Sequence, residues 1–492
     1  MNKGSYYNYI IKRFLSIFVL FFTKSQTVLA DANRELYYDE NIVIDNNFIN
    51  NNRIKINLLE PCIVASANGN EANVKTQKKY TPVVKKEQAF VLDNIYKKIS
   101  SNLKITKLYD IGIDKNSCRD ISNYIANNEK YNISNYILSD QLSNFDFIVT
   151  MLVFDVGDEK MKLQVMIWDI LEEKFVDGHY YILDYGKNNN SYRVANLISD
   201  FIFTNTTNEG CGIFDSKIAY VAEVGGVMNR KKQISIINFD GTNNVKVTSS
   251  KNLKLTPVFS RYKNDEIFYL EYLKEGPFVI KHNLTTNSLT KISSGQIMTT
   301  SASVNPNKKN NQIVIAGTNS NADTNLYLFD FKKMVNKKLT DSNSINTAAS
   351  FSSDGKEIVY VSDRSGVRKL YVKNLEDNTE KLISKGQGIY DKPSWSPDGK
   401  LISFVKIANG QFYLGLMTPY GDSERYIMSD YLIEGVKWSP NSRYLIYTKQ
   451  KDAFGKKSIP KIYIIDILTG DEYQIKTPEN EGASDPDWIM NF

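Results

Sequence analysis

Histidine is nearly absent from this 492-residue chain, and the motifs of the common hydrolases are missing. Neither His179 nor His282 stands in the H-E-x-x-H spacing that places two zinc ligands on one helix face. No Gly-x-Ser-x-Gly sequence is present to carry the nucleophile of an α/β serine hydrolase, and no glycine-rich loop ends in Gly-Lys-Ser/Thr. We therefore expect a protein that is not an enzyme, with no catalytic residues, no metal and no cofactor.

Cysteine is also scarce, with three residues at Cys62, Cys118 and Cys211. An odd number leaves at least one thiol unpaired, and spacing alone does not give the connectivity of the others. Free cysteines are often buried as small hydrophobic residues. We favour that interpretation over a functional disulfide.

No apolar run is as long as the roughly 20 residues that a membrane-spanning helix needs. The run Phe14–Phe22 follows Lys3, Lys12 and Arg13 and precedes Val28-Leu29-Ala30, which is the layout of a signal peptide over residues 1–30. Removing these residues takes away four basic and no acidic residues, so the formal charge falls from +6 to +2. We expect an exported chain that does not bind nucleic acid, because a nearly neutral chain attracts phosphate backbones weakly.

Residues 31–208 predict an α+β N-terminal domain that begins with an Asn-rich leader. Apolar residues recur at helical spacing from Glu87, and again at Val194, Leu197, Ile198, Phe201 and Ile202. Strand-like stretches are predicted at residues 41–45, 53–58, 104–111, 146–154, 161–168 and 174–183. These elements predict two or more helices packed against a mixed sheet.

Beyond Cys211 a long-period repeat replaces the helical spacing. Its clearest copies are Pro393-Ser-Trp-Ser-Pro-Asp-Gly399, Val436-Lys-Trp-Ser-Pro-Asn441 and Ala349-Ser-Phe-Ser-Ser-Asp-Gly355. We call the aromatic residue, or its replacement, the anchor. The anchors lie at Phe214, Phe259, Val304, Phe351, Trp395, Trp438 and Trp488, with spacings of 45, 45, 47, 44, 43 and 50 residues.

These spacings predict an all-β six-bladed propeller over residues 209–492. Strands are predicted after each anchor, and repeats of about 40 to 50 residues with four short strands are typical of propeller blades. The last anchor, Trp488, has no blade after it, so we expect its strand to complete the first blade and close the ring. Asp-Gly in the anchors provides the positive φ of a tight turn.

Acidic residues recur near the predicted blade ends. Because Asp side chains hydrogen-bond their own backbone in turns, we interpret the acids as turn residues, while a calcium ion in the channel stays an alternative. Arg364 beside Asp363 is interpreted as part of an ion pair between blades. The acids considered are Asp354, Asp363, Asp391, Asp398, Glu434, Asp485 and Asp487.

The loops that lead into the anchors are the candidate binding surface. On a ring they converge around one mouth of the channel, where propellers hold ligands. Within them we select Thr347, Tyr390, Asp391 and Glu434 as candidate partner contacts. The loops are residues 251–256, 295–301, 342–348, 386–392, 430–435 and 478–484.

Several motifs together resemble the TolB family, the periplasmic component of the bacterial Tol-Pal system. They are the junction Phe214–Glu223, the stretch ending Asn238-Phe-Asp-Gly241, the strand end Tyr360–Gly366, the Trp-Ser-Pro-Asp-Gly anchors and the terminal Ser484-Asp-Pro-Asp-Trp488. The resemblance is strong from about Val194 to the end and weak before Asp146. It implies the same two-part fold and a monomer in the periplasm.

The resemblance also implies an adaptor that supports outer-membrane integrity and cell division. Family members bind the lipoprotein Pal across the propeller face, which makes them peripheral to the outer membrane, and engage TolA through the mature N-terminal segment. In this sequence the matching segment is Asp31–Asp45, with Asp31, Arg34, Ile42, Val43 and Ile44 as candidate contacts. The leader is longer and more polar than the family pattern, and Ala348 stands where relatives can carry an acid.

Two other classes of propeller remain as alternatives. Similar repeats precede the hydrolase domain of prolyl-oligopeptidase relatives, but here only four residues follow Trp488 and the nucleophile motif is missing. A glycan-binding or small-ligand propeller is the other alternative. It calls for aromatic residues on the rim, where Tyr390 is the one suggestive residue.

Overall fold

A computed structural model describes residues 53–63, 86–114 and 144–491, apart from 188, 208, 226–229, 250, 293–297, 320, 322, 334 and 451–458. The predicted signal peptide, the leader and its strand at 41–45 lie outside the described residues. Among the described residues, no helix has both the length and the apolar character to cross a membrane.

The N-terminal region is a mixed sheet with two helices. The sheet has the order β3-β1-β4-β5-β6, in which β3, β1 and β4 run parallel while β4, β5 and β6 form antiparallel hairpins. The short strand β2 also pairs with β4. The elements are β1 (Ile54–Leu59), β2 (Cys62–Ile63), α3 (Lys86–Ile105), β3 (Tyr109–Asp114), β4 (Phe147–Gly157), β5 (Lys160–Asp169), β6 (Lys174–Asp184) and α6 (Ser191–Thr206).

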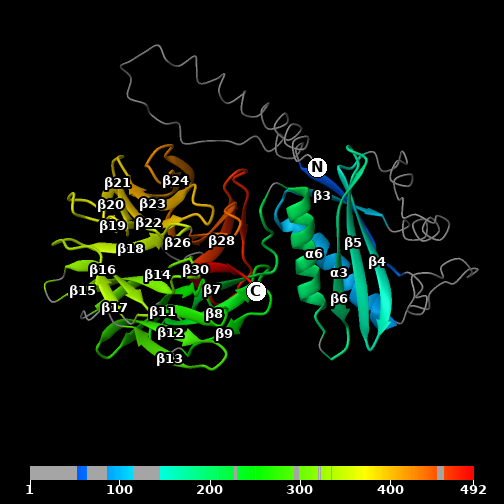
Figure 1. Ribbon diagram of the computed structural model, residues 1–492, viewed down its shortest axis with the longest axis horizontal. Coiled ribbons are helices and arrows are strands. Elements are labelled where there is room, and N and C mark those ends of the chain that lie inside the picture. Colours follow the sequence, from blue (N-terminus) through cyan, green and yellow to red (C-terminus); the bar gives the residue numbers. More distant parts are fainter. Residues whose placement is uncertain are drawn as a thin grey trace, which may run out of the picture. The chain divides into compact units, whose positions relative to one another are not determined.

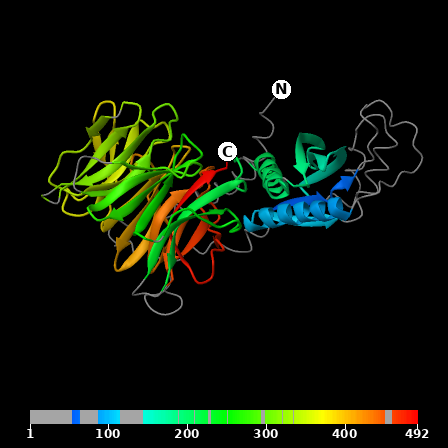
Figure 2. The same cartoon turned by 90° about the horizontal axis from the view of Figure 1, so that it is seen from below.

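Both helices bury their apolar faces against the same face of this sheet (Figure 2). Alternate residues of β5, such as Leu163 and Val165, point to the helices and are fully buried. Between the helices, the Asn102 amide donates to Asn196 Oδ1 at 2.9 Å and to Ser199 Oγ at 3.0 Å. Both hydrogen bonds of the buried Asn102 amide group therefore cross the contact between the two helices.

Helix α3 is longer than the sequence predicted, so the strand expected at 104–111 is wrong in its first part. Ile99 and Leu103 continue the apolar stripe and are fully buried, which keeps the chain helical to Ile105. The helix ends where Lys107 adopts a left-handed conformation with φ of 56°. The strand β3 then begins at Tyr109.

Six four-stranded antiparallel sheets form the blades of a propeller (Figure 1). The predicted fold class is confirmed, whereas the domain boundaries at residues 208 and 209 stay a prediction. In ring order, the blades are β30 (Gly482–Met490), β7 (Ser216–Val224), β8 (Lys231–Asn238) and β9 (Val245–Lys246); β10 (Lys254–Phe259), β11 (Glu266–Leu273), β12 (Gly276–Asn283) and β13 (Leu289–Ile292); β14 (Met298–Val304), β15 (Gln312–Thr318), β16 (Thr324–Asp330) and β17 (Val335–Lys338); β18 (Asn346–Phe351), β19 (Glu357–Ser362), β20 (Lys369–Asn374) and β21 (Glu380–Leu382); β22 (Ile389–Trp395), β23 (Ile402–Ala408), β24 (Gln411–Met417) and β25 (Arg425–Asp430); and β26 (Leu432–Trp438), β27 (Tyr444–Gln450), β28 (Lys461–Asp466) and β29 (Glu472–Gln474).

The ring closes through its last strand, as predicted from Trp488. In Figure 1 the red β30 lies beside the green β7, and the two strands are paired antiparallel. The Trp488 indole donates to Ser216 Oγ at 2.7 Å. Phe214, by contrast, does not lie on an inner strand, because β30 fills that place in the first blade; its ring packs edge-on against Phe203 and Phe239.

The repeat residues have the structural roles that the sequence predicted. The anchors on the inner strands are buried between neighbouring blades, with Trp395 7% and Trp438 5% exposed. In the turn after Phe351, Asp354 accepts hydrogen bonds from Ser352 Oγ and from the backbone N–H of Lys356, and Gly355 has φ of 74°. The interpretation of these acids as turn residues is confirmed at Asp354 and at the matching Asp398.

Two other predictions from the sequence are wrong. Arg364 pairs with Glu380 and with the Tyr360 hydroxyl of its own blade rather than with another blade, since β19, β20 and β21 bring these side chains together. Cys62 is disulfide-bonded instead of being a free buried thiol. Cys211 is free, so the expected unpaired thiol is present.

Candidate functional site

Each blade turns its first strand toward the ring axis, and each of these inner strands is interrupted by a β-bulge. The inner strands are β10, β14, β18, β22, β26 and β30. Their pairing with the second strand shifts register just before the anchor. A bulge redirects a side chain out of the regular alternation. Here it turns one residue per blade toward the axis.

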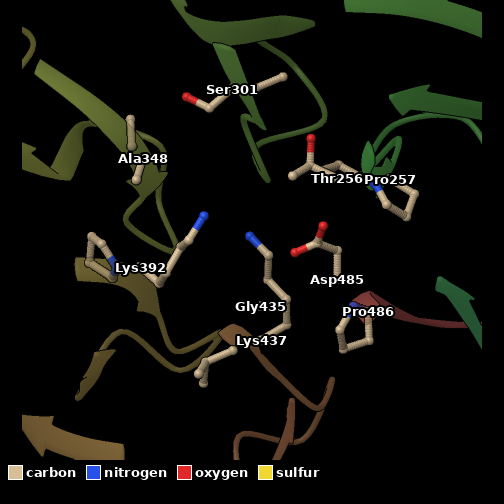
Figure 3. A pocket seen from close by; sticks show the side chains of 14 residues that line it. Thr256, Pro257, Ser301, Ala348, Lys392, Gly435, Lys437, Asp485 and Pro486 are labelled. Carbon is tan, nitrogen blue, oxygen red and sulfur yellow. The ribbon is translucent and has the colours of Figure 1, made fainter. Parts of the chain in front are cut away.

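We call these six residues the bulge ring. Each stands three residues before its anchor, and all six line one axial cavity of about 80 Å³ (Figure 3). Five of them have positive φ, between 45° and 61°, although only one is glycine. The members are Thr256, Ser301, Ala348, Lys392, Gly435 and Asp485.

The six candidate loops lie around one end of the channel, as the sequence predicted. The last residues of five of the predicted loops, at 256, 301, 348, 392 and 435, line the same cavity, and the sixth loop ends one residue before Asp485. The residues that follow in each strand, among them Pro257, Pro393 and Pro486, complete a largely apolar wall. The loops therefore meet at one mouth of the channel.

The charges of this cavity come from Lys392, Lys437 and Asp485, whose side chains point into it in Figure 3. Among the described residues, no carboxylate lies within 4 Å of either ammonium group. Burial, together with the positive charges of Arg261 and Lys392, lowers the pKa of Lys437 against the opposing effect of Asp487 and Asp485. Although Glu434 as a whole is exposed, removal of its carboxyl group from water by the neighbouring chain, together with the charge of Asp485, raises the pKa of this residue beside the cavity.

Three of the four candidate partner residues occupy equivalent places. Thr347, Asp391 and Glu434 are each the last paired residue before the bulge on three successive inner strands. Glu434 is exposed, while Thr347 and Asp391 are partly buried, and Asp391 forms an ion pair with Arg368. The structure brings these three residues to one rim; their contact with a partner stays a prediction.

Tyr390 is fully buried, so its ring offers no surface to a partner in this conformation. Its hydroxyl donates to Glu424 Oε1 at 2.8 Å, and the ammonium groups of Lys369 and Lys406 lie 4.8 and 5.1 Å from the ring centroid. These contacts hold the partly buried Glu424 carboxylate behind the rim through several donors. Asp31, Arg34, Ile42, Val43 and Ile44 lie outside the described residues.

The acidic residues near the channel are the candidate metal ligands in the sequence, and the structure shows their contacts. Among the described residues no group of three or more His, Cys, Asp or Glu side chains is arranged to hold a metal ion. Two of the acids near the channel are held by arginines, Asp391 by Arg368 and Asp487 by Arg261. A channel-bound calcium ion stays a hypothesis, and it would have to lie near two ammonium groups.

Sequence reasoning missed the bulge ring and with it Lys392, Lys437 and Asp485 as cavity residues. The six members share no residue type, so no motif reveals them. Their constant offset of three residues from the anchor was the available signal. It gains meaning only once the inner strands are known to be bulged.

A protein-family model and two related proteins match this chain. A family model described as the TolB beta propeller domain matches residues 204–491. The Tol-Pal system protein TolB of Gluconobacter oxydans (strain 621H) is 31% identical over 336 residues, which cover 68% of this chain and 72% of that protein. The Tol-Pal system protein TolB of Rickettsia bellii (strain OSU 85-389) is 38% identical over 352 residues, covering 70% of this chain and 78% of the relative.

A solved structure shares the fold. The crystal structure of TolB from Acinetobacter baumannii superposes with a TM-score of 0.68 at 17% identity, covering 89% of this chain and 96% of that chain. At this level of identity the likeness concerns the fold alone.

Proposed function

The chain belongs to the TolB family, and on that premise we propose that it is the TolB component of a Tol-Pal system, acting in the periplasm as a non-catalytic adaptor. The observation that carries this proposal is the family match over residues 204–491, together with relatives that are named Tol-Pal system protein TolB. The role is to hold envelope proteins together in support of outer-membrane integrity and constriction during division.

The rim of the propeller is the proposed surface for the lipoprotein Pal. Thr347, Asp391 and Glu434 present a hydroxyl and two carboxylates at matching places on three neighbouring blades. The cavity inside the rim is lined mostly by apolar residues. A polar rim around an apolar centre is the usual anatomy of a protein interface.

The N-terminal segment is the proposed contact for TolA. It comprises residues 31–45, in which Ile42, Val43 and Ile44 form a short apolar stretch that predicts a strand able to pair with a partner. Separate binding surfaces for Pal and TolA allow one monomer to link two proteins.

The test is capture of the two partners by the full chain and its variants. Glu434→Lys reverses an exposed charge at the rim and is expected to weaken Pal capture about tenfold or more, since like charges placed opposite each other cost several kcal/mol at an interface. TolA capture should not change. Deletion of residues 31–45 should give the opposite pattern.

The matched control is Glu376→Lys. Glu376 is equally an exposed glutamate, but it lies in the turn after β20, at the end of its blade opposite the channel mouth. It should capture Pal as the wild type does. The adaptor proposal fails if the wild-type chain captures neither protein, and the rim assignment alone fails if Glu434→Lys and Glu376→Lys behave alike.

A further inference from the structure

The two lysines of the axial cavity lack the acidic partners that the buried lysines of the propeller have. Lys254 lies 3.2 Å from Glu271, and Lys449 lies 2.9 Å from Asp430 and 3.0 Å from Glu472. Lys392 and Lys437 have no such contact among the described residues. Their side chains reach into the cavity from the adjacent inner strands β22 and β26 (Figure 3).

The position of Lys437, directly before the anchor, holds an acceptor for a neighbouring blade in two of the other blades. The residue before the anchor is Ser350 in one blade and Asp487 in another, and each accepts a hydrogen bond from the backbone N–H of the next blade's anchor, at 3.0 and 2.8 Å. A lysine ammonium has donors only and cannot make this contact. The sixth blade therefore has no such acceptor at this position and places a positive charge in the channel instead.

The wall around these lysines is poor in groups that stabilise charge. Alanine, valine and proline side chains form most of it, so the ammonium of Lys437 is partly removed from water without an ion-pair partner. An uncompensated charge in such a place is unfavourable. The lowered pKa of Lys437 agrees with this geometry.

Polar groups of the cavity can complete a binding site for a negative charge. The hydroxyls of Thr256 and Ser301 line the same cavity and are available as donors. Asp485 is the one carboxylate among the described lining residues, and it lies beyond ion-pair distance of both lysines. The volume of about 80 Å³ has room for a few water molecules, which suits an acetate-sized group and excludes a sugar ring.

We propose that the axial cavity binds a small oxyanion, a carboxylate or a phosphate, between Lys392 and Lys437. This site goes beyond the adaptor role and does not depend on it. Two sources share this chemistry: a free anion of the surrounding solution, and the side-chain carboxylate of a protein docked on the rim. Either one provides the missing counter-charge.

The first experiment is isothermal titration of the full chain with sodium acetate, and separately with inorganic phosphate, at constant ionic strength. One saturable site is expected per chain. Lys392→Met and Lys437→Met keep the apolar length of the side chain and remove its charge, and each should weaken binding about tenfold or more, the usual effect of losing a charge-assisted hydrogen bond. Lys381→Met, an exposed lysine on the outer strand β21, serves as the control and should bind as the wild type does.

The second experiment distinguishes the two sources. If a partner's carboxylate occupies the site, Lys392→Met and Lys437→Met reduce Pal capture, and acetate competes with Pal for the wild-type chain. If a free anion occupies it, both variants lose acetate or phosphate binding while Pal capture is unchanged. Either result supports the site, and wild-type behaviour of both variants in both experiments overturns it.

Thermal unfolding separates loss of binding from loss of fold. Because Lys437 has no partner to lose, Lys437→Met should unfold at the wild-type temperature or above in buffer without acetate. Only the wild type should then gain in unfolding temperature when acetate is added. Failure of the wild type to capture either Pal or TolA, with acetate binding intact, would contradict the adaptor role and leave this site standing.

Discussion

At the scale of single residues, backbone conformation determines which side chains face the channel. Four non-glycine members of the bulge ring hold a left-handed conformation, for example Lys392 with φ of 49° and Asp485 with φ of 48°. Such residues cost on the order of 1–3 kcal/mol each, so the surroundings must hold them in place. The backbone N–H of Asp485 donates to Thr448 Oγ1 at 2.9 Å, and that of Lys392 donates to the Asp391 carboxylate at 2.8 Å.

Asp487 shows how one residue can connect two blades. Its side chain is fully buried, and it accepts hydrogen bonds from the backbone N–H of Phe259 at 2.8 Å and from Arg261 Nη2 at 2.7 Å. Arg261 also donates to the backbone carbonyl of Trp488 at 3.0 Å. The carboxylate thus joins the closing strand β30 to the second blade.

We expect Asp487→Ala to lower the free energy of unfolding by about 3 kcal/mol, because it leaves the Arg261 charge and a buried backbone donor without a partner. Chemical denaturation measures this loss. Asp398→Ala is the matched control, since Asp398 bonds within its own turn, and its loss should be about 1 kcal/mol or less. Equal losses for the two variants would show that the connection between blades contributes no extra stability.

At the scale of elements, one acidic side chain stabilises the connection between α6 and β7. Asp200 on α6 accepts hydrogen bonds from the backbone N–H groups of Phe214 at 2.7 Å and Asp215 at 2.9 Å. Burial raises the pKa of Asp200 from 3.8 to about 7, and the nearby charge of Asp215 acts in the same direction. The two backbone donors act in the opposite direction but do not cancel the effect of burial.

This shift predicts a loss of stability as the pH rises from about 4 to about 7. The folded state binds the Asp200 proton more tightly than the unfolded state, so the contribution is fully present below pH 4 and is lost as the pH rises through the folded pKa. Its size is up to about 4 kcal/mol. In Asp200→Asn, which cannot ionise, this part of the pH dependence should disappear when unfolding free energies are compared across that range. A pH dependence that is the same in both proteins would mean that Asp200 is ionised throughout.

Elements with a strong repeat could be predicted from the sequence, and those fixed by tertiary contacts could not. The six blades and the closing role of β30 followed from the anchor spacing, because each anchor fills the same buried place between blades. The end of α3 was misjudged, since Lys104 to Ile111 is compatible with a strand until Ile99 and Leu103 are known to share a core with the sheet. The sequence also predicts an anchor at Phe214, whereas in the structure β30 fills that place in the first blade.

The candidate site was predicted in position but not in composition. The rim loops and three of the four chosen residues lie where the repeat placed them. The sequence predicts Tyr390 on the rim, but the structure buries it behind Glu424, because period-two alternation turns it away from its neighbour Asp391. The charges of the cavity depend on bulges, which have no common residue type here.

At the scale of the whole molecule, the ring depends on strand pairing between residues far apart in the sequence. The strand β7 follows the first region of the chain, while β30 lies near residue 492, and together they complete the first blade. Without β30, the edge of β7 would expose unpaired N–H and C=O groups, and the second blade would lose the Asp487 contact. An open sheet edge is a site for aggregation.

We therefore expect a chain that ends at Glu481 to lose its cooperative unfolding transition and to self-associate in size-exclusion chromatography with light scattering. A synthetic peptide of residues 482–491, added in excess, should restore the monomer and the single transition, because it supplies the missing strand. The same peptide with Asp487→Ala and Trp488→Ala is the control and should restore neither, since it lacks the carboxylate that holds Arg261 and the indole that binds Ser216. A shortened chain that stays monomeric and unfolds at the wild-type temperature would show that the ring is stable without its closing strand.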